Sequence, residues 1–257
     1  MKEELYTIPL MDAFRAEDEC PFCYIERDVE QNALDFVLGR DASYMQDHVR
    51  AETDRIGFCR KHYEKMFNYS ETLANALILE TRIKYLMKEM KSEMKKCSVS
   101  GKISFKEKML KDPSSVRDNN NVSRWVHEKE ESCYICDHIK RNYDRYVATF
   151  FYLYKKKESE FIDLVKNGKG MCLHHLADIL VAAPLYLNKK EEEELRNILF
   201  PQTISNMERV LEDVEWLQKK FDYRYKDAEW KNSRDAVQRA MQKITGGYPA
   251  DPPYRPR

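Results

Sequence analysis

The stretch Cys20-Pro21-Phe22-Cys23 decides the fold expected for this chain, because it opens a pattern that occurs twice. After 35 intervening residues comes Cys59-Arg60-Lys61-His62. Cys133-Tyr134-Ile135-Cys136 is followed, after the same interval of 35, by Cys172-Leu173-His174-His175, so the whole pattern returns at an offset of 113 residues. In both copies a glycine stands two positions before the third cysteine. A shared spacing of this length indicates an internal repeat.

Each copy supplies the donors of a tetrahedral metal site. A Cys-x2-Cys turn at the start of a helix brings two sulfurs within reach of one ion, and a Cys-x2-His pair adds a third sulfur and an imidazole nitrogen. The sequence therefore predicts two bound ions, with Zn²⁺ as the expected metal, and one site within each copy. The 35 residues between the pairs would form a helical hairpin that leaves the site and returns to it. The eight predicted ligands are Cys20, Cys23, Cys59, His62, Cys133, Cys136, Cys172 and His175.

Two points about these sites stay open at the level of sequence. Three thiolates and a histidine could also hold an iron–sulfur cluster, because thiolate donors accept zinc, iron–sulfur clusters and copper(I) alike. In the second copy either His174 or His175 could be the fourth ligand, and the register of the first copy selects His175. The seventh cysteine, Cys97, has no counterpart in the repeat and is interpreted as an incidental thiol at a helix end.

The composition favours an all-α fold of two related zinc-stapled helical hairpins and a long C-terminal helical region. Only 7 of 257 residues are glycine, and long stretches consist of Glu, Lys, Leu, Met and Arg, which lose little entropy in a helix. Apolar residues recur at helical spacing from Phe22 to Leu38 and from about Glu71 to Lys95. Pro201 is expected to separate two C-terminal helices, since its ring is tolerated at a helix start and not inside a helix.

The domain organisation is predicted from these elements and from the breaks between them. Ser, Lys, Asp and Asn replace the helical pattern after Cys97, which indicates a linker. We expect a first Cys/His metal-binding helical repeat at 1–96, a polar linker at 97–121, a second Cys/His repeat at 122–187, C-terminal helices at 188–247 and a disordered tail at 248–257.

Charge and the N-terminal residues bear on compartment and partners. Lys+Arg and Asp+Glu are balanced at 44 each, without the clustered basic footprint of a dedicated nucleic-acid binder. The N-terminus Met1–Leu5 lacks the apolar core of a secretory signal, and no apolar run approaches bilayer length. We therefore expect a cytoplasmic protein without a membrane partner, in which spaced cysteines remain reduced.

Four stretches carry a family resemblance: Ile8–Phe14, Cys20–Cys23, Val49–Asp54 leading into Gly57–Cys59, and Ser233–Ala236. By these stretches the chain resembles a family of uncharacterised bacterial proteins of similar length, and the resemblance extends over nearly the whole sequence. Some members of that family are labelled as substrate-binding proteins of ABC transporters, a role that requires an export signal not found here. The resemblance supports the metal sites and implies no reaction.

The number of ligands indicates a function without catalysis. A catalytic zinc keeps an open position for water, whereas each copy here supplies four protein ligands. The sequence thus predicts a non-enzymatic metal-stabilised scaffold that binds another protein or a second copy of the chain, and it names no small-molecule substrate. One alternative is a zinc–thiolate redox switch, in which oxidation ejects the metal. Another is an enzyme with a polar pocket near His48, Arg50 and Glu52.

Overall fold

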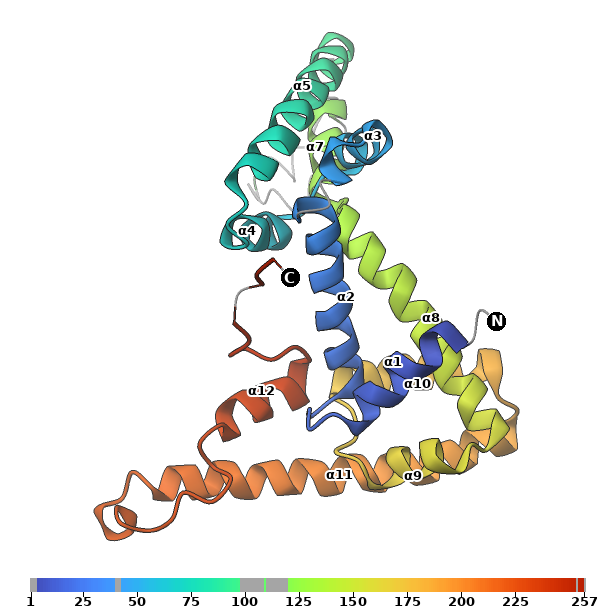
Figure 1. The fold of residues 1–257 in the computed structure, drawn as a ribbon, viewed down its shortest axis with the longest axis vertical. Coiled ribbons are helices and arrows are strands. Elements are labelled where there is room, and N and C mark those ends of the chain that lie inside the picture. Colours follow the sequence, from blue (N-terminus) through green and yellow to red (C-terminus); the bar gives the residue numbers. More distant parts are fainter. Residues whose placement is uncertain (1–3, 40–42, 98–108, 110–119, 253, 257) are drawn as a thin grey trace. The chain divides into compact units, whose positions relative to one another are not determined.

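The computed structural model describes residues 4–39, 43–97, 109, 120–252 and 254–256, and it contains helices and no strand among them (Figure 1). The all-α fold class expected from the sequence is confirmed. None of the helices in these ranges is both long and apolar enough to cross a bilayer. The elements in chain order are α1 (Glu4–Arg15), α2 (Pro21–Leu38), η1 (Ser43–Met45), α3 (Asp47–Ile56), α4 (Arg60–Asn68), α5 (Thr72–Lys96), α7 (Asn121–Glu131), α8 (Tyr134–Lys156), α9 (Ser159–Asn167), α10 (Leu173–Tyr186), α11 (Lys189–Lys219), η3 (Tyr223–Tyr225) and α12 (Ala236–Thr245).

The internal repeat is visible in the order of the helices. A long helix follows each Cys-x2-Cys pair, α2 in the first copy and α8 in the second. A short helix then ends at Ile56 or Asn167, just before the turn that holds the repeated glycine, and the Cys-x2-His pair opens α4 or α10. A long helix closes each copy, α5 or α11. The offset of 113 residues found in the sequence is therefore an offset between equivalent helices.

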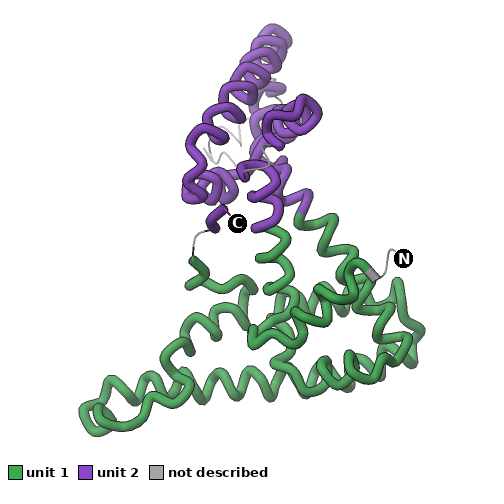
Figure 2. The backbone as a smooth tube through the Cα atoms, in the orientation of Figure 1, with its two compact units in different colours: residues 1–30, 139–252 green, residues 31–138, 253–257 purple. Residues whose placement is uncertain are grey.

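The chain forms two compact units whose borders do not follow the two copies (Figure 2). Unit 1 comprises residues 1–30 and 139–252, and unit 2 comprises residues 31–138 and 253–257. The chain passes from one unit to the other inside α2, inside α8 and again after Pro252. Each unit therefore combines parts of the expected repeats at 1–96 and 122–187, and most of the expected linker lies outside the described residues.

Unit 1 has an aromatic core that joins helices from both copies. Phe14 of α1 meets Phe161 of α9 edge to face, with ring centroids 5.2 Å apart. Phe22 at the start of α2 meets Phe150 of α8 at 6.0 Å. All but Phe14 are fully buried, and edge-to-face rings of this kind add a favourable contact to the burial of apolar area. The start of the first copy is therefore held by the second copy.

Unit 2 shows the reciprocal arrangement. Its helices α3 and α5 from the first copy pack together, and α7 from the second copy packs on α5. The apolar stripe of α2 continues here with Leu34 and Leu38, which are at most 1% exposed. Tyr69 is fully buried, and its hydroxyl donates a hydrogen bond to Asp35 of α2.

The last long helix, α11, runs unbroken from Lys189 to Lys219 with Pro201 inside it, so the expected separation into two helices is wrong. An interior proline costs about 3 kcal/mol because it removes one backbone hydrogen bond and crowds the preceding turn. Leu195 and Leu199 before the proline and Thr203 after it are buried, and this packing offsets the cost.

The structure describes most of the segment 248–257, for which the sequence predicts a disordered tail. Residues 248–252 and 254–256 form no helix, but Asp251 pairs with Arg27 at 3.3 Å within unit 1. Within unit 2, the guanidinium of Arg255 donates to the carbonyl oxygen of Asn68 at 3.1 Å, and the backbone carbonyl of Arg255 accepts a hydrogen bond from the Gln31 side chain at 2.8 Å. The described part of this segment therefore has defined contacts.

Candidate metal centres

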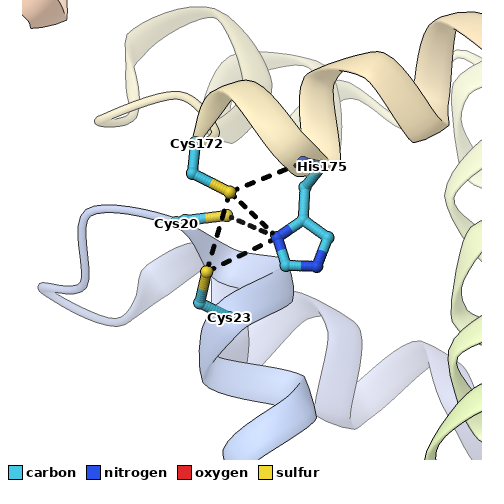
Figure 3. Close-up of side chains that lie close together, drawn as sticks. All are labelled: Cys20, Cys23, Cys172 and His175. Carbon is cyan, nitrogen blue, oxygen red and sulfur yellow. Dashed lines mark hydrogen bonds between the residues drawn. The ribbon is translucent and has the colours of Figure 1, made fainter. Parts of the chain in front are cut away.

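Four side chains converge in unit 1 to form a cluster that we call centre A: Cys20, Cys23, Cys172 and His175 (Figure 3). The Nδ1 atom of His175 lies 3.3 Å from the sulfur of Cys20, 3.4 Å from that of Cys23 and 3.1 Å from that of Cys172. The sulfurs of Cys23 and Cys172 are 3.8 Å apart. No ligand of this centre is more than 1% exposed.

Helix starts hold the ligands of centre A in place. Cys20 and Cys23 flank the first residues of α2, while Cys172 is the N-cap of α10 and His175 lies in its first turn. The first backbone N–H groups of a helix have no partner inside the helix, so they are available to a sulfur and favour its negative charge. One of them, on His175, donates to the sulfur of Cys172 at 3.5 Å.

The ring of His175 is oriented by its neighbours. Its Nε2 atom lies 3.3 Å from a carboxylate oxygen of Glu26, one turn along α2 from Cys23. The rings of Phe22 and Tyr143 flank the imidazole at centroid distances of 5.7 and 5.4 Å. A carboxylate at Nε2 favours the proton on that nitrogen, which leaves the Nδ1 lone pair directed at the three sulfurs.

The segment after α12 covers centre A. The N–H of Gly247 donates to the sulfur of Cys23 at 3.3 Å. A Cβ placed on Gly246 would lie 3.4 Å from the sulfur of Cys172, and this residue has φ of +77°. Glycine therefore allows the backbone to turn here and to approach the sulfurs closely.

A buried charge cluster stands directly before the first ligand of centre A. The carboxylate of Glu19 pairs with Lys243 at 3.3 Å, with Arg209 at 2.5 Å and with Arg239 at 3.7 Å. The ammonium of Lys243 also donates to the backbone carbonyl of Glu19 at 2.6 Å. Burial alone would raise the pKa of Glu19, but Arg209 and Lys243 bring that pKa below its usual value. The cluster fixes α12 against the residue that precedes Cys20.

A second cluster, which we call centre B, lies in unit 2 and consists of Cys59, His62, Cys133 and Cys136. The Nδ1 atom of His62 lies 3.2 Å from the sulfur of Cys59, 3.1 Å from that of Cys133 and 3.3 Å from that of Cys136. The sulfurs of Cys59 and Cys136 are 3.8 Å apart. His62 and Cys133 are buried, Cys59 is partly buried and Cys136 is exposed.

The turn around Gly57, just before α4, is hydrogen-bonded to the segment that carries Cys133 of centre B. Gly57 has φ of +77°, and its carbonyl oxygen accepts a hydrogen bond from the N–H of Tyr134 at 2.9 Å. Ser132 donates to the carbonyl oxygen of Ile56 at 2.6 Å. The buried guanidinium of Arg82 donates to carbonyl groups at the end of α3. These bonds join the Cys59 turn of the first copy to the Cys133 turn of the second.

In the equivalent turn of unit 1, a glutamine takes the place of Arg82 and binds the carbonyl groups at the end of the preceding helix. Gly170 has φ of +73°. Gln202 of α11 donates to the carbonyl oxygens of Val165 and Gly168, at the end of α9. The glycine two positions before the third cysteine thus adopts a left-handed conformation in both copies.

The eight predicted ligands are the eight residues of the two centres, but the expected pairing within each copy is wrong. Each centre combines the Cys-x2-Cys pair of one copy with the Cys-x2-His pair of the other. Helix lengths give the reason. At 1.5 Å per residue, α2 with 18 residues spans about 27 Å, whereas α3 with 10 residues returns only about 15 Å. A hairpin of these helices does not come back to its own first pair.

The thiols within each centre differ in how readily they ionise. Burial would raise the pKa of Cys133, but hydrogen bonds from His62 and from backbone N–H groups lower that pKa to about 6. In centre A burial is likewise outweighed for Cys20 by its interactions with Cys172, Cys23 and His175, and its pKa falls well below the ordinary value. The pKa of Cys136 is raised by burial and by the charge of Cys133. Three sulfurs this close become thiolates together only with a cation among them.

A comparison with known proteins assigns the chain to a family. A model described as a family of unknown function, DUF6062, matches residues 1–251. The chain belongs to this family. No curated protein and no solved structure matches it. The family resemblance expected from the sequence is therefore confirmed, and the chemistry of the site has to be argued from the residues themselves.

Other residues singled out in the sequence lie outside the two centres. His174 is exposed and its Nε2 atom lies 3.7 Å from Asp178, whereas His175, which the register of the first copy selects, is the histidine of centre A. Cys97 is exposed and its thiol donates to Asn120 at 3.6 Å. His48 and Arg50 both lie on α3, where His48 is exposed and Arg50 donates to the carbonyl of Leu77 at 3.3 Å.

The residues that surround centre A do not stand out in the sequence. The Gly246-Gly247 pair was visible in the sequence, but it indicated only the end of a helix. Glu19 and Lys243 are 224 positions apart, and nothing in their spacing relates them. Glu26 could have been noticed, because it lies three residues beyond Cys23 on the face of the same predicted helix.

Proposed function

We propose that centres A and B each bind one zinc ion. A tetrahedral zinc with typical bond lengths requires sulfurs roughly 3.8 Å apart and sulfur–nitrogen separations of roughly 3.5 Å. The sulfur pairs at 3.8 Å and the Nδ1–sulfur distances of 3.1–3.4 Å fit these values closely. Three sulfurs and one nitrogen are also a donor set that zinc prefers in closed structural sites.

The observation that carries this proposal is the double convergence of distant segments. In centre A the ligands Cys20 and His175 are 155 residues apart, and in centre B the ligands His62 and Cys136 are 74 apart. The same Cys3His set forms both times, although each set is assembled from both copies. Metal binding explains why three sulfurs and an imidazole nitrogen come together twice, whereas the packing of reduced cysteines alone does not require it.

Elemental analysis of the freshly purified chain, combined with native mass spectrometry, tests the metal. Two zinc ions per chain are expected, and their removal with a chelator should lower the thermal stability. An absorbance scan distinguishes colourless zinc from an iron–sulfur cluster, which absorbs visible light. A folded chain without metal, indifferent to the chelator, would contradict the proposal.

The second part of the proposal is a role as a non-enzymatic scaffold for another protein in a reducing compartment, the cytoplasm. Both donor sets are filled by four protein ligands, which leaves no coordination position for water or substrate. Val181 and Leu185 lie one turn apart on α10, the helix that starts at centre A, and are 79% and 80% exposed. Large apolar side chains presented in this way favour contact with a partner.

Capture experiments with the tagged chain test the scaffold role. Partners held by unit 1 should be lost with Val181→Asp/Leu185→Asp while both ions remain bound. They should also be lost with Cys172→Ser, which removes a ligand of centre A. Leu73→Asp is a matched control, because Leu73 is 69% exposed but lies on α5 in unit 2. An identical set of partners for all these variants would contradict the scaffold.

A further inference from the structure

Centre B has an accessible edge formed by the sulfurs of Cys59 and Cys136. Cys136 is exposed and Cys59 is partly buried, whereas the other two ligands, His62 and Cys133, are only 1% exposed. The sulfur of Cys136 lies in the first turn of α8 and that of Cys59 at the N-cap of α4. A small molecule in solution can therefore reach this edge without opening the core of unit 2.

Centre A contains a pair with the same separation and no such access. The sulfurs of Cys23 and Cys172 are 3.8 Å apart, as are those of Cys59 and Cys136. Cys23 and Cys172 are 1% and 0% exposed, and the Gly246-Gly247 segment lies over them. The two pairs are thus matched in spacing and differ in exposure, which together with thiolate character governs the oxidation of cysteines.

We propose that Cys59 and Cys136 are a modification site at which a hydroperoxide forms a disulfide and releases the metal of centre B, while centre A keeps its metal. This inference rests on the proposed binding of zinc at both centres. It assigns the redox reactivity of the chain to one edge of one centre.

The reaction balances with hydrogen peroxide as the oxidant. The Cys136 thiolate attacks one peroxide oxygen, the O–O bond breaks, and hydroxide leaves as a sulfenic acid forms. The Cys59 thiolate then attacks the sulfenic sulfur and expels a second hydroxide. Together two thiolates, one hydrogen peroxide and two protons give one disulfide and two waters. The two electrons lost by sulfur are gained by the peroxide.

Loss of the metal follows from the ligands that remain. Only Cys133 and His62 are left, and two ligands do not complete a tetrahedral zinc site. The new disulfide still joins the start of α4 to the start of α8, so the two copies stay connected in unit 2. A thiol reductant should therefore restore the centre when zinc is supplied.

Peroxide titration of the zinc-loaded full chain tests the inference, in a Cys97→Ser background that removes the exposed thiol outside the centres. Zinc release is followed with a chromogenic chelator, and disulfides are mapped by mass spectrometry after alkylation. One of two ions should be released, with a Cys59–Cys136 link and reduced Cys23 and Cys172. A starting chain without two zinc ions would contradict the proposed function itself, before any oxidant is added.

Two variants separate the proposed reaction from general damage. Cys136→His retains a zinc ligand but removes the exposed sulfur, and it should slow release of the first ion by roughly tenfold or more. The control His174→Ala, an exposed residue beside centre A that belongs to neither centre, should leave the rate of the first release unchanged. The inference is overturned if both ions leave at one rate, if Cys23–Cys172 is the first disulfide, or if Cys136→His releases zinc as fast as its parent.

Discussion

Centre A and centre B carry the same four donors at the same spacing, yet one is enclosed and the other is open at one edge. Both use a Cys-x2-Cys pair before a long helix and a Cys-x2-His pair at the start of another. Every ligand of centre A is at most 1% exposed, whereas Cys136 of centre B reaches the surface. The ligand pattern therefore sets the donors and does not set their access to solvent.

The difference comes from residues that have no copy in the first repeat. The cover of centre A is the Gly246-Gly247 segment after α12, and α12 is held by the pairing of Lys243 and Arg239 with Glu19. This helix follows the second copy of the repeat and lies in unit 1 with centre A. A duplicated site can thus acquire two different chemical environments through a single additional helix.

The largest expected effect tests the crossed pairing on which the comparison depends. Cys20→Ser with Cys172→Ser changes two ligands of centre A and should remove one ion. Cys20→Ser with Cys59→Ser changes one ligand in each centre and should remove both ions, together with much of the roughly 10–16 kcal/mol that a structural zinc site can contribute. Native mass spectrometry counts the ions. With pairing inside each copy the two results would be exchanged.

How far the sequence leads can be seen from the same ligands. Their identity follows from spacing alone, because Cys-x2-Cys and Cys-x2-His pairs are local patterns at helix starts. Which pairs share a centre does not follow from spacing, because it depends on where α2 and α8 take the chain. At 1.5 Å per residue, the 18 residues of α2 span about 27 Å and the 23 residues of α8 span about 35 Å. Pro201 shows a related limit: tertiary burial of Leu195 and Leu199 overrides a local rule about helices. The cover of centre A could not be foreseen, because it depends on contacts 224 residues apart.

A smaller effect is expected where α12 is fixed beside centre A. Glu19→Gln removes the carboxylate that three cationic side chains share and leaves the 4% exposed Lys243 unpaired. We expect unfolding of unit 1 to become easier by about 3–5 kcal/mol, as for other broken buried ion pairs. Urea unfolding with zinc in excess measures the change. An unaltered unfolding midpoint would show that the cluster does not hold α12.

The pH dependence of this variant has a defined sign. The pKa of Glu19 is lowered from 4.5 in the folded chain, so its stabilising effect is complete above about pH 4.5 and is lost as the pH falls through the lower folded pKa. The difference in the free energy of unfolding between Glu19→Gln and the parent chain should therefore be constant near neutral pH and become smaller in acid. A difference that widens in acid would be inconsistent with a carboxylate at the centre of the cluster.

The glycine turns before the two Cys-x2-His pairs should respond unequally to the same substitution. Gly170→Ala places a Cβ 3.4 Å from Gln202 in a left-handed conformation, which costs about 1–2 kcal/mol. Gly57→Ala has the same conformational cost and also places the Cβ 2.5 Å from the guanidinium of Arg82. Thermal unfolding of the two variants should rank Gly57→Ala as the more destabilised. Equal shifts would mean that Arg82 can move away without loss.

The smallest effect is expected for the residue that most resembles a ligand without being one. His174 is adjacent to His175, but it is exposed and its Nε2 atom lies 3.7 Å from Asp178. His174→Ala should leave two ions bound and change the stability by at most about 0.5 kcal/mol, because exposed pairs of this kind contribute little. His175→Ala should remove the ion of centre A. If the alanine at 174 removed an ion instead, the register shared by Cys59-x2-His62 and Cys172-x2-His175 would be wrong, and the two centres could no longer be compared ligand by ligand.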